Sequence, residues 1–507
     1  MMAAVDRTSV RARERPAETV VGSLARRSSA HPSRAALMVG GERVSYLELW
    51  QRSSAAAQQL EQWGVRQGDR VLLAAPSTPA FAYGYFATHL LGAIAVPLDP
   101  HAPEARREEL VRRAAPRLAF GAKAERGGAA GEVRAMRELD GLSLQGREFR
   151  PPGLEALADL MFTTGTTGRP KGVPLTQHNV ASAARHINAV IGNAEGDVEV
   201  MPLPLYHSFG LGRLRCNIVA GGTVVLVDGF RLPGEIFSAL KTHRATGLVG
   251  VPAGIAVLLR SGAAGLGAFA GQLRYIEIGS APMPLEHKRQ LMDLLPATKL
   301  WMHYGLTEAS RSAFIEFHRD RARLHSIGRT APGVKFSVRS DAGKPCRAGE
   351  PGQLWVSGPH VSPGYWQDAE LTARSFADGW VCTGDVVHME ADGFVVLHGR
   401  KDDMINVGGF NVSPDEIERV LCEHPGVHEA GCIGVPDPRK ITGQVVRAYL
   451  ISPPGHDMPS DEELSRWVAA RLEPYKVPMQ YVWLEALPRT ASGKLVRAEL
   501  RGGMAGQ

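Results

Sequence analysis

The sequence predicts an α/β protein: a large N-terminal part with two parallel-sheet α/β subdomains and a small β-barrel, followed by a small, mobile C-terminal α+β domain. Through the first four hundred residues, short apolar runs alternate with stretches of helical periodicity. Such alternation indicates mostly parallel strands covered by helices. After about Ser326, glycines, prolines and short strand-like runs dominate, which favours a small barrel or sandwich. A mixed α+β pattern begins at Asp402.

Short apolar runs predict the buried strands of the parallel sheets. A helix is expected after Ser45, a suitable N-cap, because apolar residues from Leu47 to Leu60 recur behind it at helical spacing. Ligands of such sheets bind at loops beyond the carboxyl ends of the strands, so functional residues are expected there. A further, mostly apolar run, Leu157–Met161, is interrupted only by Asp159; the predicted strands are Val71–Ala75, Ala93–Val96, Thr223–Val227, Gly247–Val251 and Tyr275–Ile278.

The later part of the chain predicts shorter strands and two helices. Ser413 followed by Pro414 indicates a helix start, and Ser460 with acidic residues behind it indicates another. The expected strands are Leu354–Val356, Trp380–Cys382 and Phe394–Leu397. We therefore predict a disordered terminus over 1–20, a large domain over 21–401 with a β-rich part over about 326–401, and a small domain over 402–507.

The composition is that of a globular protein. Of the 507 residues, 44% are hydrophobic and 22% are charged, which excludes disordered and fibrous classes. The 58 lysines and arginines exceed the 52 acidic residues by only 6. No basic block is interleaved with aromatic residues, so nucleic-acid binding is not expected.

The sequence also predicts a compartment. Its apolar runs are shorter than the roughly 20 residues of a membrane helix, and its start has no apolar segment of the kind found in secretion signals. The five cysteines form no CxxC pair, which fits a reducing cytoplasm. We expect a cytoplasmic protein without a membrane span, and a monomer and a homodimer both remain open.

The strongest motif is the run FTTGTTGRPKGV from Phe162 to Val173. Its glycines let backbone N–H groups face an anion, and Lys171 adds a positive charge suited to phosphate. It is not a Walker A loop, because Pro170 stands where that motif has glycine. The residues expected to hold phosphates are Thr163, Thr164, Gly165, Thr166, Thr167, Gly168 and Lys171.

This run resembles the phosphate loop of the adenylate-forming superfamily, which contains acyl-CoA synthetases, adenylation domains of peptide synthetases and luciferases. The resemblance covers nearly the whole chain after about residue 20, and further motifs follow in the family's order. They are most similar to those of acyl- or aryl-CoA ligases. The resemblance implies that ATP and Mg²⁺ are used to activate a carboxylic acid.

Several motifs correspond, by this resemblance, to the nucleotide site. The run GSAP resembles the segment that cradles adenine, and in YGLTE the tyrosine is expected to stack on adenine. The aspartate of TGD is expected to accept hydrogen bonds from both ribose hydroxyls, which suits the two oxygens of a carboxylate. The expected contacts are Gly279, Ser280, Ala281, Pro282, His303, Tyr304, Gly305, Asp385 and Arg400.

The resemblance also implies which residues act in the chemistry. His207, in the run YHSFG, is expected near the α-phosphate and the acyl carbon. Thr307 is expected at the α-phosphate, and Lys494, in PRTASGK, is the expected catalytic lysine. The resemblance also implies that Thr166 and Glu308 help to hold Mg²⁺, which is consistent with the preference of this ion for oxygen ligands. The expected catalytic residues are Lys494, His207, Thr307 and Glu308.

Two features of the C-terminal part correspond, by the resemblance, to a second reaction step in which a thiol takes over the activated acyl group. Asp402 occupies the family's hinge position between the large and small domains. Gly408, Gly409 and Phe410 resemble the strip that lines the entry tunnel of a thiol, where glycines permit a pantetheine arm to pass. The resemblance thus implies that the small domain rotates and presents a different surface for thiol attack.

The acid itself is only partly defined. Relatives that activate amino acids carry an aspartate near the His207 segment, which is absent here, so an α-amino acid is disfavoured. The remaining pocket candidates are largely apolar and suit an aromatic or aliphatic acid. His303 stands where many relatives have a small residue, and Arg213 is a candidate partner for a polar substrate group. The pocket candidates are Phe209, Leu211, Arg213, Val251, Ala281, Met283 and Ser310.

The expected reaction is formation of an acyl-AMP and pyrophosphate, followed by transfer of the acyl group to coenzyme A. One alternative acceptor is the phosphopantetheine thiol of an acyl carrier protein. Another alternative is a nucleotide-binding regulator without catalysis, which the presence of Lys171, Glu308, Asp385 and Lys494 disfavours. A luciferase-like oxidation also remains open.

Overall fold

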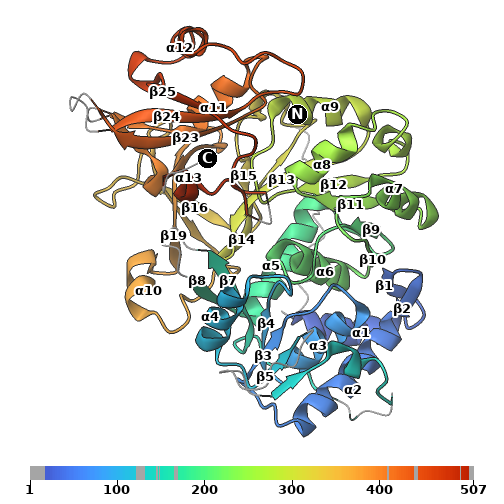
Figure 1. Ribbon diagram of the computed structural model, residues 1–507. Coiled ribbons are helices and arrows are strands. Elements are labelled where there is room, and N and C mark those ends of the chain that lie inside the picture. The colour runs from blue at the N-terminus through green and yellow to red at the C-terminus, as the bar shows by residue number, and fades with distance from the viewer. Residues whose placement is uncertain are drawn as a thin grey trace, which may run out of the picture.

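The computed structural model describes residues 18–121, 132–143, 147, 149–164, 170–407, 410–438, 444–490 and 493–501. Its largest element is a nine-stranded sheet whose central strands are parallel, as predicted (Figure 1). In spatial order its strands are β15 (Arg329–Thr330), β14 (Ala309–Glu316), β13 (Lys299–Leu306), β12 (Tyr275–Ile278), β11 (Gly247–Gly250), β9 (Val198–Met201), β10 (Thr223–Leu226), β1 (Ala35–Val39) and β2 (Glu42–Ser45).

A second, six-stranded sheet lies below the first in Figure 1. Its strands are parallel except for the last, which pairs antiparallel with its neighbour. The predicted strands of both sheets are present, with ends that differ by at most two residues, and Tyr275–Ile278 agrees at both ends. In spatial order the strands of the second sheet are β6 (Glu132–Arg134), β5 (Leu118–Phe120), β3 (Arg70–Leu73), β4 (Ile94–Pro97), β7 (Leu157–Thr164) and β8 (Pro170–Thr176).

Two helices, α5 (Gln177–Ile191) and α6 (Ser208–Ala220), lie between these two sheets (Figure 1). One side of this pair contributes Val180 and Leu214 to the core around β3 and β5. The other side contributes Ile187 and Cys216 to a core with β12 and β13. Burial of apolar side chains on both sides fixes the two sheets relative to each other.

Other helices cover the outer faces of the sheets. In α2 the Ser45 hydroxyl accepts a hydrogen bond from the Glu48 N–H at 3.1 Å, so the predicted N-cap is confirmed. The helices beside the six-stranded sheet are α1 (Val20–Ala30), α2 (Tyr46–Gln62), α3 (Pro79–Leu90) and α4 (Glu104–Ala114). Those on the outer face of the nine-stranded sheet are α7 (Pro233–Thr242), α8 (Pro252–Leu259) and α9 (Leu285–Leu294).

The region where a β-rich part was predicted forms a five-stranded antiparallel sheet. Its longest strand, β19, pairs with three others and carries Asp385. The strands are β16 (Lys335–Arg339), β17 (Gly352–Ser357), β18 (Phe376–Ala377), β19 (Trp380–Met389) and β20 (Val395–Arg400), and one helix, α10 (Ala369–Ser375), precedes β18.

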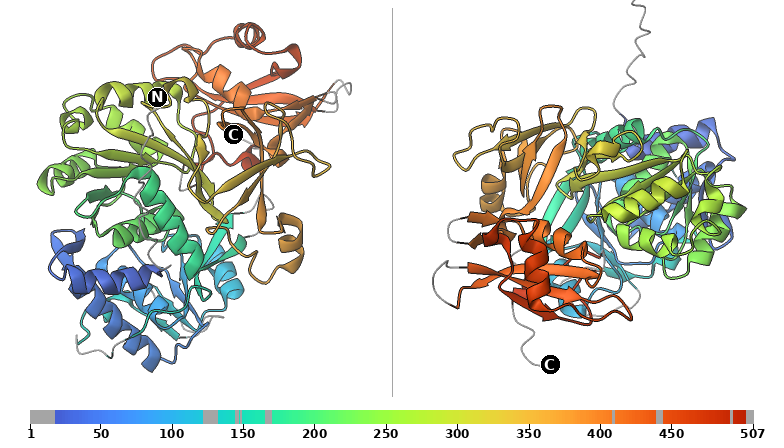
Figure 2. Two further views of the ribbon diagram at one scale, coloured as in Figure 1. Left: turned by 180° about the vertical axis from the view of Figure 1, so that it is seen from behind. Right: turned by 90° about the horizontal axis from the view of Figure 1, so that it is seen from above.

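The elements after Asp402 form a compact group at one end of the molecule, in orange and red in Figure 2. Ser413 and Ser460 cap its two main helices, as predicted. The strands are β21 (Ile405–Val407), β22 (Phe410–Val412), β23 (Glu429–Pro436), β24 (Gln444–Ile451) and β25 (Gln480–Trp483), and the helices are α11 (Pro414–Cys422), α12 (Asp461–Ala469) and α13 (Arg497–Arg501). None of the helices in the described ranges is long and apolar enough to cross a bilayer.

Four buried charges lie between α6 and the nine-stranded sheet. The Arg213 Nε donates to Glu199 Oε1 at 3.0 Å, and Arg213 Nη1 lies 2.9 Å from Glu277 Oε2. Arg311 Nε donates to Glu277 Oε1 at 2.8 Å. All four side chains are at most 3% exposed. Two arginines and two glutamates balance, so this charge cluster (Glu199, Arg213, Glu277, Arg311) is neutral as a whole.

A second buried group explains the aspartate inside the apolar run of β7. Asp159 contacts Arg215 of α6 and lies 3.2 Å from the Nε2 of His89 on α3. Arg215 also donates to the Tyr85 hydroxyl at 2.8 Å. Asp159 thus joins β7, which leads into the Thr-rich loop, to the helices behind it.

Removal of one charged side chain from the charge cluster should lower the stability of the folded protein. We predict that Glu277→Ala lowers the free energy of unfolding by about 3–5 kcal/mol, because Arg213 and Arg311 then remain buried without compensation. Urea denaturation measures the change. The control is Glu370→Ala, which removes an exposed carboxylate whose ion pair with Arg374 lies at the surface and should change little. Equal effects of the two substitutions would contradict this account of the cluster.

Candidate active site

The Thr-rich motif lies at the turn between β7 and β8. In this hairpin Thr163 pairs with Lys171, and Thr164 pairs with Pro170. The strand ends therefore bring Lys171 to the base of the turn. Four of the phosphate candidates, Gly165, Thr166, Thr167 and Gly168, lie outside the described residues.

Tyr365 connects Lys171 with Glu308. Its hydroxyl donates to Glu308 Oε1 at 2.8 Å, and the Lys171 ammonium lies 5.6 Å from the centre of its ring. The backbone N–H of the neighbouring Trp366 donates to the Gly172 carbonyl at 2.8 Å, which connects this segment to β8. The sequence-based reasoning did not identify Tyr365. The aromatic pair in Gly364-Tyr365-Trp366, inside a Gly- and Pro-rich stretch, is the signal that could have found it.

Glu308 fits the role of a metal ligand. The residue is 9% exposed, and within the described part of the chain its Oε2 has no hydrogen-bond donor. A buried carboxylate oxygen of this kind suits a hard cation that also binds phosphate oxygens. The described residues contain no group of three His, Cys, Asp or Glu that would hold a metal alone.

Tyr304 near the end of β13 and Arg400 at the end of β20 gather around Asp385 in the middle of β19. The Tyr304 hydroxyl donates to Asp385 Oδ2, and Arg400 Nη1 lies 3.4 Å from Asp385 Oδ1. Burial raises the pKa of Asp385 above its ordinary value, while the charges of Arg400 and Lys494 and the Tyr304 hydrogen bond act in the opposite direction. Three motifs that are separate in the sequence thus meet around one carboxylate.

The loop that carries Lys494 lies against the large part of the chain. A Cβ placed on Gly493 would be 3.9 Å from the Cβ of Ala253, on α8. The loop is held by hydrogen bonds from Arg489 to the Gly493 carbonyl at 2.7 Å and from the Lys494 N–H to the Thr490 hydroxyl at 3.1 Å. The exposed side chain of Lys494 is close enough to Asp385 to influence its pKa.

His207 is the residue before α6, and its carbonyl accepts the N–H of Leu211 at 3.0 Å. Its ring packs against Tyr206, with ring centres 4.8 Å apart. Burial lowers the pKa of His207, and the Asp99 carboxylate opposes that change. A largely neutral imidazole at the amino end of α6 can offer one donor and one acceptor.

The GSAP segment follows β12, as expected for a loop beyond a strand. The His303 ring lies directly over Gly279: a Cβ there would be only 2.1 Å from two atoms of the ring. Only glycine fits at this position. Ser280 has a φ of +77° and is exposed with Pro282, whereas Ala281 is partly buried.

The acyl-pocket candidates divide into two groups. Phe209 packs on His303, Val251 precedes α8, Met283 lies in the loop between β12 and α9, and Ser310 lies at the start of β14. Leu211 and Arg213 are fully buried instead. Because Arg213 is paired with Glu199 and Glu277, its charge is not available to a polar group on a substrate, which corrects the expectation for this residue.

Only some of the residues expected to form the thiol tunnel and the hinge lie within the described ranges. Gly408 and Gly409 lie outside the described residues. Phe410 is 55% exposed and stacks on Tyr475, with ring centres 4.5 Å apart. Asp402 lies in a short turn (401–403) that joins β20 to β21, which is where the sequence predicts the hinge.

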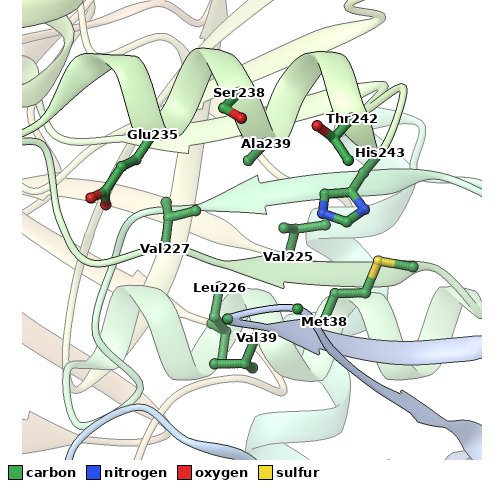
Figure 3. A pocket seen from close by; sticks show the side chains of 12 residues that line it. Met38, Val39, Val225, Leu226, Val227, Glu235, Ser238, Ala239, Thr242 and His243 are labelled. Atoms are coloured by element: carbon green, nitrogen blue, oxygen red, sulfur yellow. The ribbon is translucent and has the colours of Figure 1, made fainter.

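Of two pockets in the described part of the chain, only the smaller one is lined by a residue of these motifs. The smaller, of about 110 Å³, is lined by Lys171, Tyr365 and Trp366, among others. The larger, of about 280 Å³, lies between β1, β10 and α7, where Val225 and Val227 point toward the helix (Figure 3). The larger pocket contains none of the residues singled out from the sequence.

Comparison with known proteins gives consistent matches. The model of the AMP-binding enzyme family matches residues 24–366, and that of the AMP-binding enzyme C-terminal domain matches residues 416–494. A feruloyl-CoA synthase from Amycolatopsis is 34% identical, over 94% of this chain and 97% of its own. A 2-succinylbenzoate–CoA ligase from Bacillus licheniformis is 31% identical, over 94% of this chain and 98% of its own.

A solved structure extends these matches to three dimensions. The o-succinylbenzoate CoA synthetase from Bacillus subtilis, in complex with its acyl-adenylate intermediate, superimposes with a TM-score of 0.88 at 29% identity, covering 96% of this chain and 99% of its own. The unliganded form of the same synthetase gives a TM-score of 0.83 at 26% identity, covering 92% and 99%.

The contact between Tyr365 and Glu308 can be tested. We predict that Tyr365→Phe raises the Mg²⁺ concentration needed for half-maximal activity by about tenfold or more, because the loss of one hydrogen bond to a carboxylate is worth about 1.5–3 kcal/mol. Mg²⁺ titration of ATP-dependent activity measures the shift. The matched control is Tyr475→Phe, at a tyrosine that packs on Phe410 away from Glu308. An unchanged Mg²⁺ requirement in Tyr365→Phe would show that the hydroxyl does not position Glu308.

Proposed function

The chain belongs to the AMP-binding enzyme family, and on that premise we propose that it joins a carboxylic acid to coenzyme A through an acyl-adenylate. The observation that carries the proposal is the gathering of Tyr304 and Arg400 around Asp385, together with the approach of the Lys494 loop to α8. These residues come from the large part of the chain and from its C-terminal end. The first half-reaction requires this arrangement, because Asp385, which would bind the ribose, and Lys494, which would move with the C-terminal part, must face the same nucleotide.

In the first step the carboxylate of the acid attacks the α-phosphate of ATP, forming the mixed anhydride and releasing pyrophosphate. Both reactants are anions, so positive charge must offset their repulsion. Lys494 would bridge the carboxylate and the α-phosphate, and Lys171 would hold the leaving phosphates. No general base is needed, since a carboxylic acid is already ionised at neutral pH.

The remaining groups hold the nucleotide. Asp385 would accept hydrogen bonds from the two ribose hydroxyls, and Tyr304 would stack on adenine. Thr307 and His207 would contact the α-phosphate region, and Glu308 would take part in holding Mg²⁺. When bound, this ion neutralises charge on the leaving pyrophosphate.

In the second step the thiol of coenzyme A attacks the carbonyl carbon of the adenylate and expels AMP. We propose that the part of the chain after Asp402 rotates about the turn at 401–403, which removes Lys494 and presents the strip of Gly408, Gly409 and Phe410. The higher similarity to the adenylate-bound than to the unliganded relative supports assigning the arrangement seen here to the first step.

The relatives favour one class of acid and one acceptor. Both are named for aromatic acids and for coenzyme A. The aromatic and apolar character of Phe209, Val251 and Met283 suits an aromatic acid. We therefore propose an aromatic acid that is not an α-amino acid, with coenzyme A rather than a carrier protein as the acceptor.

Lys494 provides the test of the two steps. We predict that Lys494→Ala lowers acid-dependent pyrophosphate release by about 10²–10³-fold, because a charge aimed at the developing transition state is lost. Thioester formation from supplied acyl-AMP and coenzyme A should be retained. The two reactions are measured separately, by pyrophosphate release and by acyl-CoA formation.

The matched control is Lys476→Ala. This lysine belongs to the same C-terminal part but is paired with Glu416 and Glu473, at 2.8 Å each, so both reactions should persist. Equal loss of both half-reactions in Lys494→Ala would contradict the division of labour proposed here.

A further inference from the structure

The smaller of the two pockets is lined by side chains from three separate segments of the chain. Arg113 comes from the last turn of α4, Lys171 from the start of β8 and Trp366 from the segment before α10. The volume of about 110 Å³ is well below the roughly 300–1,000 Å³ of pockets that hold drug-sized ligands. The pocket therefore suits a small ion or a single phosphate group.

Two cations that line this pocket can still donate hydrogen bonds. The Lys171 ammonium lies 5.6 Å from the centre of the Tyr365 ring, and no carboxylate in the described ranges pairs with it. Arg113 Nε lies 3.4 Å from Glu109 Oε1, but the guanidinium donates no hydrogen bond to any described residue. The nitrogens of a guanidinium form a planar fork that matches the oxygens of a phosphate. Both cations are therefore available to an oxyanion.

Trp366 supplies a third donor. Its indole N–H is buried and has no acceptor among the described residues. The backbone N–H of the same residue donates to the Gly172 carbonyl at 2.8 Å, which holds Trp366 against β8. Because a buried donor without an acceptor is unfavourable, an oxyanion that accepts from this indole would bind more tightly than one that does not.

The acidic groups around the pocket leave a positive balance. Asp368 is the one carboxylate among the residues that line it, and its Oδ1 accepts the N–H of Leu371 at 2.9 Å as the cap of α10. Glu109 lies between Arg106 and Arg113, at 3.9 and 3.4 Å. Two cations against one carboxylate favour an anion in the pocket.

The pocket adjoins the residues that the proposed function assigns to the polyphosphate of ATP. Tyr365 lines it and donates to Glu308 Oε1 at 2.8 Å, so the proposed magnesium ligand is one hydrogen bond away. Lys171, which would hold the leaving phosphates, lines it as well. A phosphate group in the pocket would thus lie next to the place where pyrophosphate leaves ATP.

We propose that Arg113, Lys171 and the indole N–H of Trp366 form a subsite for the terminal phosphate of the leaving pyrophosphate. This inference rests on the proposed function, since that reaction releases pyrophosphate. Arg113 and Trp366 belong to none of the motifs identified in the sequence, so they extend the phosphate site beyond the Thr-rich run.

The test measures the binding of pyrophosphate by calorimetry, in the presence of Mg²⁺ and without ATP or acid. Arg113→Ala should raise the Kd for pyrophosphate about tenfold, because a charge-assisted hydrogen bond is lost. The matched control is Arg112→Ala, which changes the net charge equally at the neighbouring position of α4. Arg112 is 60% exposed, lies 4.0 Å from Glu108 and does not line the pocket, so its Kd should stay within about twofold. An equal rise in both variants, or no rise in Arg113→Ala, would overturn the inference.

Two further measurements define the ligand. Trp366→Phe keeps an aromatic ring but removes the donor, and should raise the Kd about threefold or more. Orthophosphate should bind the unaltered protein about tenfold more weakly than pyrophosphate, because it has no second phosphate group to reach the neighbouring magnesium site. Equal binding of the two anions would contradict the assignment to the leaving group. Thermal unfolding of each variant checks its fold, and the comparison of the two anions requires no variant.

The outcomes separate this inference from the proposed function. If a carboxylic acid triggers pyrophosphate release from ATP but Arg113→Ala binds pyrophosphate like the unaltered protein, the inference is wrong and the proposed function stands. If pyrophosphate binds through Arg113 but no aryl or fatty acid triggers its release, the proposed function fails, and the assignment of this anion site to a leaving group fails with it.

Discussion

In the proposed reaction, electrostatic repulsion between a carboxylate and a polyphosphate is the constraint that the site must overcome. Two anions approach each other only where cations offset their charge. Here the cations come from separate parts of the chain: Lys171 from β8, Arg400 from β20 and Lys494 from the C-terminal loop. A site assembled in this way can lose one cation by a movement of the C-terminal part while the others stay in place. That property suits a reaction whose two steps need different surroundings.

The rigid side of the site depends on buried charges that compensate one another. Glu277 pairs with Arg213 and Arg311 and also orients His303. Asp159 pairs with Arg215 behind the strand that leads to the Thr-rich loop. Since unpaired buried charges are strongly unfavourable, each group restricts the relative position of α6 and a sheet. The loops at the strand ends are therefore attached to sheets whose positions relative to α6 are restricted.

The sequence predicts much of this arrangement because its signals are local. Apolar runs located the strands, Ser45, Ser413 and Ser460 located helix starts, and short motifs identified the family. The sequence could not predict contacts between distant residues. Tyr365 meets Glu308 across 57 positions, and neither residue indicates the other. Arg213 resembled a pocket residue by its position after YHSFG, but its partners lie on β9 and β12.

The most direct test of the central claim is a reversible lock on the C-terminal part. A Cβ built on Gly493 would lie 3.9 Å from the Cβ of Ala253, within the range of a disulfide, so Ala253→Cys with Gly493→Cys should cross-link in the arrangement described, at the cost of the strain that the φ of +82° at residue 493 imposes on a side chain. The account predicts that the oxidised double variant forms one equivalent of acyl-AMP and pyrophosphate but no acyl-CoA, and that reduction restores thioester formation. The single variants control for each cysteine. Acyl-CoA formation by the fully oxidised protein at the rate of the reduced protein would contradict the claim that Lys494 must leave before the thiol can react.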